Sequence, residues 1–296
     1  MSPVPVEFPA PTERLRLMAV HAHPDDESSK GAASTAKYVD EGVDVLVVTC
    51  TGGERGDILN PSFTLSGRDI AQVRREEMAL AADILGIQHH WLGFIDSGFP
   101  EGDPLPPLPD GCFAALPLAE TVPSLVHLIR QFRPHVITTY DENGGYPHPD
   151  HIRTHQIAVE AFELSAEEDY LTDLPAWSVA KLYYHHTFTQ TRVRALHNAC
   201  TEAGLDSPFD GWLDGWDEPD EMFQRVTTRI HVSDYFEVRD SALRAHATQI
   251  DPDGSWFGVP LEIQRVVWPT EDFELAISRI GEISSESDLF DGLRKT

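Results

Sequence analysis

Four short strand-like segments, each followed at once by a cluster of polar residues, constrain the fold of this chain more than any other feature. They span 15–20, 43–49, 89–92 and 136–139. Helical patterns separate them, at 28–40, 68–85 and 118–132. Strands that alternate with helices indicate βαβ units and a parallel sheet. We therefore predict an α/β fold, with a Rossmann-like, mostly parallel sheet flanked by helices and a smaller C-terminal α+β region.

The composition divides the chain into three expected parts. Residues 1–13 are rich in proline and are predicted to form a disordered leader. Residues 14–165 are predicted to form the α/β core. Residues 166–296 are predicted to form the smaller C-terminal region, which completes the substrate pocket, with His246 and Gln249 as the candidates for lining the site. The acidic stretch 165–178 is interpreted as a solvated connection. The remaining expected features are a strand at 181–187, an irregular acidic excursion at 206–221 and a helix at 234–248.

Charge and cysteine content limit the partners and the compartment. The formal net charge is −27, from 22 Lys and Arg against 49 Asp and Glu. Such a field repels nucleic acid and acidic membrane surfaces. Cys50, Cys112 and Cys200 form no CxxC pair, which argues against a disulfide framework or a cysteine zinc site. The chain has neither a signal-like start nor an apolar run near the ~18 residues of a membrane span. We expect a soluble cytoplasmic protein that binds neither nucleic acid nor membranes.

The unusual polar residues lie directly after the four predicted strands. The sequences there are HAHPDDE (21–27), TGGERGD (51–57), GFIDSG (93–98) and YDENGGYPHPDH (140–151). Parallel sheets bind their ligands outside the carboxyl ends of the strands. A functional site is therefore expected at this edge.

Two of these clusters contain the residue types that bind a divalent metal ion. His23 and Asp26 lie three positions apart across a turn, and His151 is able to complete a His₂Asp set from another loop. Imidazole and carboxylate ligands suit zinc, and three protein ligands leave a position open for water. Asp25 is not needed as a ligand and is free to act as a base. The alternative is that HPDDE only begins a helix, with Asp25 or Asp26 as the N-cap.

Other motifs argue against competing sites. TGGERG has neither the GxGxxG order nor a following Gly-Lys-Ser/Thr, so it is not a nucleotide loop. Its glycines are expected to let the backbone approach a ligand. His155 follows His151 at helical spacing without the Glu of HExxH, and it is interpreted as a packed or exposed helix residue. The pairs 89–90 and 185–186 lie in strand patterns, where neighbouring side chains face opposite ways, and are interpreted as structural. Taken alone, Arg74 suggests only a surface ion pair with Glu77.

Taken together, the runs AHPDDE, TGGE, DSG and GGY-x-HPDH resemble the PIG-L/LmbE-like metal-dependent amide hydrolases and deacetylases. The resemblance extends over about 14–290. It implies one Zn²⁺ per chain, with Fe²⁺ as an alternative, bound by His23, Asp26 and His151. It also implies that Asp25 is the general base.

The resemblance implies further roles at the matching positions. His148 would stabilise the tetrahedral intermediate, with Asp150 holding it in a charged form, and Tyr146 would contact the substrate carbonyl. Substrate-binding roles fall on Glu54, Arg74, Asp96 and Lys30.

The implied activity is that of a metal-dependent hydrolase of linear amide C–N bonds. The wording of the motifs, with Lys30 in SSKG, is most similar to the branch that cleaves mycothiol S-conjugates between glucosamine and N-acetylcysteine in detoxification. One alternative is deacetylation of N-acetylglucosaminyl-inositol in mycothiol biosynthesis. A second is a metal-containing sugar- or inositol-binding protein, against which the spare base Asp25 argues.

Overall fold

The computed structural model describes residues 3–10, 12–170, 173–213, 220–281 and 285–294. Its described strands form one seven-stranded sheet in the order β3-β2-β1-β4-β5-β7-β6. The first five strands of the chain pair in parallel, and β7 runs antiparallel to both β5 and β6. The strands are β1 (Arg16–His21), β2 (Asp44–Thr51), β3 (Gln88–Phe94), β4 (Val136–Thr139), β5 (Lys181–His185), β6 (Thr228–His231) and β7 (Thr270–Ser278). The predicted mostly parallel α/β fold is confirmed.

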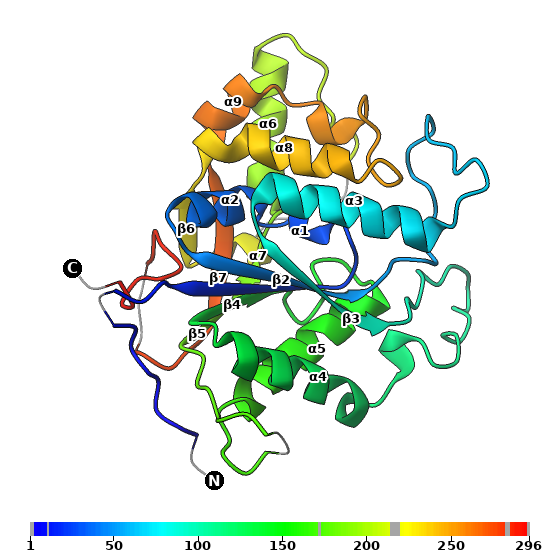
Figure 1. Ribbon diagram of the computed structural model, residues 1–296. Coiled ribbons are helices and arrows are strands. Elements are labelled where there is room, and N and C mark those ends of the chain that lie inside the picture. Colours follow the sequence, from blue (N-terminus) through cyan, green and yellow to red (C-terminus); the bar gives the residue numbers. More distant parts are fainter. Residues whose placement is uncertain (1–2, 11, 171–172, 214–219, 282–284, 295–296) are drawn as a thin grey trace.

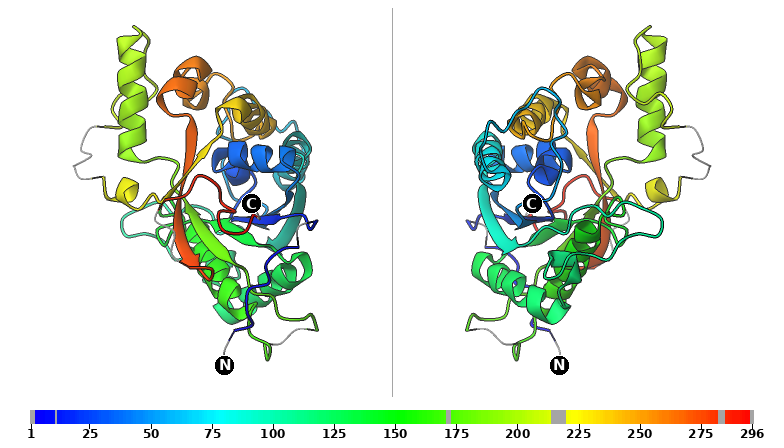
Figure 2. Two further views of the ribbon diagram at one scale, coloured as in Figure 1. Left: turned by 90° about the vertical axis from the view of Figure 1, so that its left-hand side faces the viewer. Right: turned by 90° about the vertical axis from the view of Figure 1, so that its right-hand side faces the viewer.

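Helices cover both faces of the sheet (Figure 1). On one face α4 packs against α5, and on the other α3 packs against α8, with α1 and α2 beside them. The helices are α1 (Asp26–Ser29), α2 (Ala32–Asp40), α3 (Ile70–Leu85), α4 (Leu118–Phe132), α5 (Pro149–Leu164), α6 (Gln190–Glu202), α7 (Glu221–Gln224), α8 (Phe236–Ala245) and α9 (Leu261–Val267). Figure 2 shows α6 at the periphery, near α9, against which it packs. Within the described residues, no helix combines the length and apolarity needed to cross a bilayer.

The two-residue period of the strands produces a separate core on each face of the sheet. In β1, Met18 and Val20 join the core that contains Leu125 and Ile129 of α4. Leu17, which precedes Met18 and points to the other face, joins the opposite core. Both faces are buried, which explains why these strands are apolar without interruption.

The predicted helix at 28–40 is broken in the structure. Gly31 separates α1 from α2 and adopts a φ of 82°. A Cβ at this position would lie 2.6 Å from Cε1 of His185, so a side chain here would also collide with β5. The interruption turns α1 into a single short turn at the end of β1, where it presents Asp26 and Ser29 to the site.

The C-terminal region continues the same sheet through β5, β6 and β7. Residues 3–10 form neither helix nor strand, and the N–H of Val4 donates to the carbonyl of Ala166 at 2.9 Å. The stretch at 165–178 is less solvated than expected, because Ser165 and Trp177 at its ends are buried. Residues 1–2, 11, 171–172 and 214–219, which belong to the predicted leader, connection and excursion, lie outside the described residues.

Candidate metal centre and surrounding site

The four polar loops meet at the carboxyl edge of the sheet, around the end of β1. The chain passes from β1 outward to β2 and β3, and then crosses to β4 on the other side of β1. Such a reversal of strand order opens a crevice in a parallel sheet. The loop after β1 and the start of α5 therefore bring HPDDE and HPDH together.

His23, Asp26 and His151 form a group that can hold a metal ion. One ligand atom of each lies within 4.8 Å of the others. Oδ2 of Asp26 is 3.5 Å from Nδ1 of His23 and 3.3 Å from Nε2 of His151. All three side chains are buried. The structure thus brings together the three residues expected as ligands, and two imidazoles with one carboxylate suit a divalent cation.

The hydrogen bonding of His151 fits the same interpretation. Its Nδ1 lies 2.9 Å from the carbonyl oxygen of Gly144, while its Nε2 is buried without a hydrogen-bond partner among the described residues. A ring N–H that donates to a carbonyl fixes the tautomer and leaves the other nitrogen lone pair free for a metal. The group therefore offers a cation the buried Nε2 of His151, which has no hydrogen-bond partner among the described residues and lies next to the Asp26 carboxylate.

Carboxylates surround the other ring nitrogen of His23. Its Nε2 lies 3.3 Å from Oδ2 of Asp150 and 3.5 Å from Oδ1 of Asp96. Burial opposes a charge on the ring, but the hydrogen bonds to Asp150, Asp26 and Asp96 outweigh it and raise the pKa of His23 well above its usual range. The carboxylates around His23 therefore favour positive charge there, and the same negative potential attracts a cation.

Asp25 lies beside the metal group without belonging to it. It is the residue immediately before α1. Its φ of 116° is unusual for a residue with a side chain. Burial raises the pKa of its carboxyl to about 6, against the opposing charge of Arg74, whose Nη2 is 3.5 Å from Oδ2. The HPDDE motif thus does begin a helix, as the alternative interpretation held, and it also presents a separate carboxylate.

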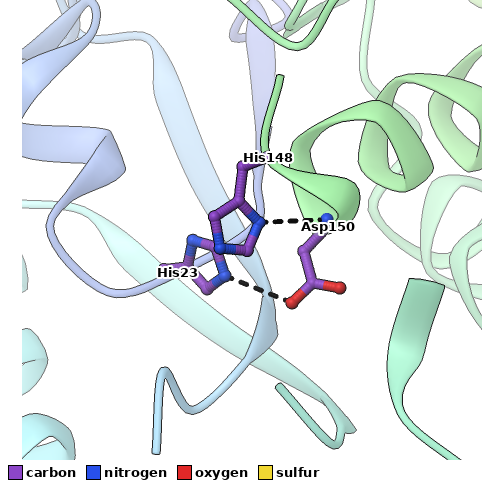
Figure 3. A group of neighbouring side chains, drawn as sticks. All are labelled: His23, His148 and Asp150. Atoms are coloured by element: carbon purple, nitrogen blue, oxygen red, sulfur yellow. Dashed lines mark hydrogen bonds and ion pairs between the residues drawn. The ribbon is translucent and has the colours of Figure 1, made fainter. Parts of the chain in front are cut away.

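The arrangement of His148 and Asp150 corrects one expectation. Figure 3 shows the backbone N–H of Asp150, at the start of α5, donating to Nδ1 of His148, while the Asp150 carboxylate points to His23. That carboxylate also accepts from the N–H of Ser97 at 2.9 Å and from its hydroxyl. It is therefore not positioned to hold His148 in a charged form.

His148 is neutral in this environment. Burial, followed by the charges of His23 and His151, lowers the pKa of His148 to about 3. Because Nδ1 accepts a hydrogen bond at 3.1 Å, the proton of the neutral ring lies on Nε2. His148 can thus donate one hydrogen bond from Nε2.

Tyr146 lies at the open side of the metal group. Its ring centroid is 4.5 Å from that of His151 and 6.0 Å from that of His148. The side chain is 46% exposed, although the residues around it are largely buried. Burial of its hydroxyl raises the pKa above the usual tyrosine range, so the hydroxyl keeps its proton.

A cavity of about 710 Å³ opens beside these residues, and we call it the main cavity. Asp25, Asp26, Lys30 and Tyr146 are among its lining residues. Nζ of Lys30 lies 2.7 Å from Oδ1 of Asp26, the carboxylate oxygen that does not face the two histidines. The volume lies within the range of small-molecule sites.

Glu54 and Asp96 form a network that joins the loops after β2 and β3. Glu54 accepts from the N–H of Asp96 at 3.0 Å, and Asp96 accepts from the N–H of Arg55 at 2.8 Å. These bonds fix Asp96 against His23. The two residues are not among those that line the main cavity.

Arg74 is not the surface residue that its spacing to Glu77 suggests. It is buried and donates to the carbonyls of Gly53 at 2.7 Å and Pro24 at 2.8 Å. Gly53 has a φ of 62°, and a Cβ there would collide with the Arg74 guanidinium. This glycine thus makes room for Arg74, and the expectation that it admits a ligand is corrected. Glu77 instead accepts from Thr248.

Sequence reasoning gave no role to Glu27, Ser97 or Tyr140, and it expected His246 at the site without naming its partner. Glu27 accepts the N–H of Asp25, and Nε2 of His246 lies 2.7 Å from Glu27. The ring of Tyr140 stacks on His151 with centroids 4.3 Å apart. Glu27 and Ser97 do lie within the HPDDE and DSG motifs, which was the available signal. His155 is a half-buried residue of α5, and its Nδ1 lies 3.0 Å from the carbonyl oxygen of Tyr140.

Known proteins resemble this chain in sequence and in fold. The family described as PIG-L, GlcNAc-PI de-N-acetylase, matches residues 18–162. A mycothiol S-conjugate amidase of Streptomyces coelicolor is 57% identical over 96% of this chain and 99% of the relative. A 1D-myo-inositol 2-acetamido-2-deoxy-α-D-glucopyranoside deacetylase of a Nocardioides strain is 40% identical over 94% of this chain and 98% of the relative. Among solved structures, the N,N'-diacetylchitobiose deacetylase of Pyrococcus horikoshii has a TM-score of 0.60 at 21% identity, covering 89% of this chain and 84% of that one.

Proposed function

This chain belongs to the PIG-L family, and on that premise we propose that it is a zinc-dependent amidase of mycothiol S-conjugates. It cleaves the amide between glucosamine and N-acetylcysteine. The products are a mercapturic acid and glucosaminyl-inositol, so the role is the detoxification of electrophiles. The observation that carries the reaction type is the approach of His23 Nδ1 and His151 Nε2 to one oxygen of Asp26, with the separate carboxylate of Asp25 beside them.

In this proposal His23, Asp26 and His151 hold the ion. Zinc in such a site supplies Lewis-acid activation of water and of the amide carbonyl. Asp25 accepts a proton from the attacking water and passes it to the glucosamine nitrogen as the C–N bond breaks. Its pKa of about 6 leaves it ionised at neutral pH and still basic enough to take the proton.

His148 and Tyr146 act on the carbonyl oxygen as it gains negative charge. His148 donates from Nε2 as a neutral ring, because Nδ1 is already bonded to the start of α5. Tyr146 lines the main cavity, and its protonated hydroxyl supplies a second donor. Donors placed in advance at an oxyanion are among the strongest contributions to catalysis.

Lys30 is our candidate for contacting the cysteinyl part of the conjugate, and Glu54, Arg74 and Asp96 for the glucosaminyl-inositol part. Lys30 lines the main cavity next to Asp26, which supports its assignment. The other three are bonded within the loops after β1, β2 and β3, and in this proposal they reach the sugar at the border of the cavity. A cytoplasmic location and Fe²⁺ as a replacement for zinc belong to the same proposal, since a His₂Asp set binds either ion.

The second candidate function is deacetylation of N-acetylglucosaminyl-inositol, favoured by the 40% identity to a deacetylase of that kind. The two are separated by measuring kcat/KM for the zinc-loaded protein on a mycothiol S-conjugate and on N-acetylglucosaminyl-inositol. A preference of at least 100-fold for the conjugate, about 2.7 kcal/mol, supports the amidase. The reverse preference identifies the deacetylase. A metal-loaded protein that is inactive on both contradicts both.

Lys30→Ala refines this comparison. If Lys30 contacts the cysteinyl part, the variant loses kcat/KM on the conjugate but not on N-acetylglucosaminyl-inositol. Equal losses on both substrates would mean that Lys30 acts through Asp26, with which it is paired. Metal content of the variant distinguishes loss of the ion from loss of substrate contact.

A further inference from the structure

A second cavity, of about 320 Å³, adjoins the main cavity, and we call it the side cavity. The two share part of their lining, which makes them continuous. The shared residues are Ser29, Thr187, Phe188, Trp212 and Trp256. Ser29 is the last residue of α1, the same short helix that begins with Asp26. The side cavity therefore joins the main cavity at α1, the helix that carries Asp26.

Three aromatic residues stand at the junction of the two cavities. The ring of Phe188 has its centroid 5.6 Å from that of Trp256 and 6.1 Å from that of Trp212. Phe188 and Trp256 are each 39% exposed, and Trp212 is 44% exposed. Exposed aromatic residues that gather around a cavity indicate a binding site, because leaving them in water is unfavourable.

The deeper wall of the side cavity is apolar. It is formed by Val193 and Leu196 of α6, Leu243 of α8, and Val259 and Phe209 from loops. Its polar residues are mostly bonded to the protein itself. Glu271 accepts from the N–H groups of Ala33 and Ser34, and Gln264 donates to the carbonyl of Val259.

Arg192 also lines the side cavity. Among the described residues, its guanidinium donates one hydrogen bond, from Nη1 to the carbonyl of Thr187 at 2.8 Å. A guanidinium group stacks well on the aromatic ring of a ligand, and so do the indole rings of the two tryptophans at the junction. The side cavity thus combines an apolar floor with flat partners on its walls.

We propose that the side cavity binds the substituent carried on the sulfur of the conjugate, and that it selects flat aromatic groups. This inference rests on the proposed amidase function. The sulfur belongs to the cysteine whose carbonyl reacts, so a carbonyl placed at the metal group sends the substituent into the space next to Asp26 and Ser29. The side cavity is the apolar space that opens there. The polar glucosaminyl-inositol group lies on the other side of the scissile bond and remains in the main cavity.

The test compares the S-benzyl and S-methyl conjugates of mycothiol, which differ in the group assigned to the side cavity. We expect the unmodified protein to prefer the S-benzyl conjugate at least tenfold in kcat/KM. Trp256→Ala removes a wall at the junction and is expected to lower the benzyl-to-methyl ratio at least fivefold. Val193→Trp fills the floor and is expected to lower the same ratio mainly by raising KM for the S-benzyl conjugate.

Trp91→Ala is the matched control. Trp91 is half-buried, packs under the guanidinium of Arg75 and lines neither cavity. This variant is expected to keep the benzyl-to-methyl ratio of the unmodified protein. Circular dichroism and melting temperature verify that all three variants are folded.

Two results would overturn the assignment while leaving the amidase intact. One is equal kcat/KM for the two conjugates in the unmodified protein. The other is a benzyl-to-methyl ratio that neither Trp256→Ala nor Val193→Trp changes in a folded protein. Failure to hydrolyse either conjugate by the metal-loaded protein would instead refute the proposed function, and the side-cavity assignment with it.

Discussion

Nε2 of His246 lies 2.7 Å from Oε1 of Glu27, although the two residues are 219 positions apart in the chain. Both side chains are buried. The other carboxylate oxygen of Glu27 accepts the backbone N–H of Asp25 at 2.9 Å. His246, which follows α8, thus supports the unusual backbone conformation of the proposed base. It does so without contacting the main cavity itself.

We predict that His246→Ala lowers kcat about tenfold with little change in KM, because a base displaced by a fraction of an ångström transfers protons poorly. His246 is a positioning residue, so His246→Gln, whose amide can donate to Glu27, is expected to restore part of kcat. His90→Ala, at an exposed position on β3, is the control. An unchanged kcat in a folded His246→Ala protein would show that Glu27 holds Asp25 without help.

Asp25→Asn is expected to keep the metal and to lose 100-fold or more of kcat, as general bases contribute roughly 10²–10⁴-fold. The reason is that Asp25 lies outside the group formed by His23, Asp26 and His151. Asp26→Asn is the contrasting variant, and it is expected to lose the ion. Elemental analysis of both proteins, measured with kcat, tests the distinction. Loss of metal from Asp25→Asn would make Asp25 a ligand.

His148→Ala is expected to retain the metal and to lose about 2.7–4 kcal/mol of transition-state stabilisation, the usual value for one oxyanion donor. The neutral state of His148 adds a second expectation. Because its pKa lies at about 3, titration of this ring does not contribute a limb to the pH–rate profile between pH 5 and 9. If the profile of the unmodified protein has a limb in that range that disappears in His148→Gln, the ring is charged during turnover.

The sequence predicted the parallel core well because its signals there are local. The helix at 118–132 and the strand at 136–139 have the predicted boundaries, with Pro117 and Pro134 marking where each pattern starts or stops. The break at Gly31 was not predicted, since it depends on the approach of His185 from β5. A contact between such distant segments leaves no trace in a helical pattern.

In the candidate site, too, the features that depend on local sequence were predicted and those that depend on long-range contacts were not. The ligand set followed from residue types and spacing, because a turn brings His23 and Asp26 together locally. The partners of Asp150 were predicted wrongly. Its carboxylate faces Ser97 and His23, which lie in the loops after β3 and β1. These contacts depend on how α5 packs against the two loops, which a local sequence pattern does not record. His246 and Gln249 were the candidates for lining the site, and Gln249 does line the main cavity, whereas His246 does not. His246 instead contacts Glu27, a role set by the packing of α8 beside α1.

Acid is predicted to destabilise the fold through His135, which lies before β4 and away from the metal group. Its Nδ1 accepts the N–H of Arg16 at 3.0 Å, and the side chain is only 2% exposed. Burial, reinforced by the charge of Arg16, lowers the pKa of His135 from 6.5 to about 4. Between these values the unfolded chain binds a proton that the folded protein does not. The free energy of unfolding therefore falls as the pH drops from about 6.5 to about 4, and this contribution levels off below that range.

The contribution of His135 is on the order of 3 kcal/mol, from 1.36 kcal/mol for each unit of pKa difference. His135→Asn isolates it, because the Asn side-chain oxygen can accept the same N–H and does not titrate. Urea unfolding at pH 7 and pH 4.5 is expected to show a smaller loss of stability for His135→Asn than for the unmodified protein. His90→Asn, at an exposed position, is expected to behave like the unmodified protein. Parallel pH profiles for all three proteins would mean that folding does not lower the pKa of His135.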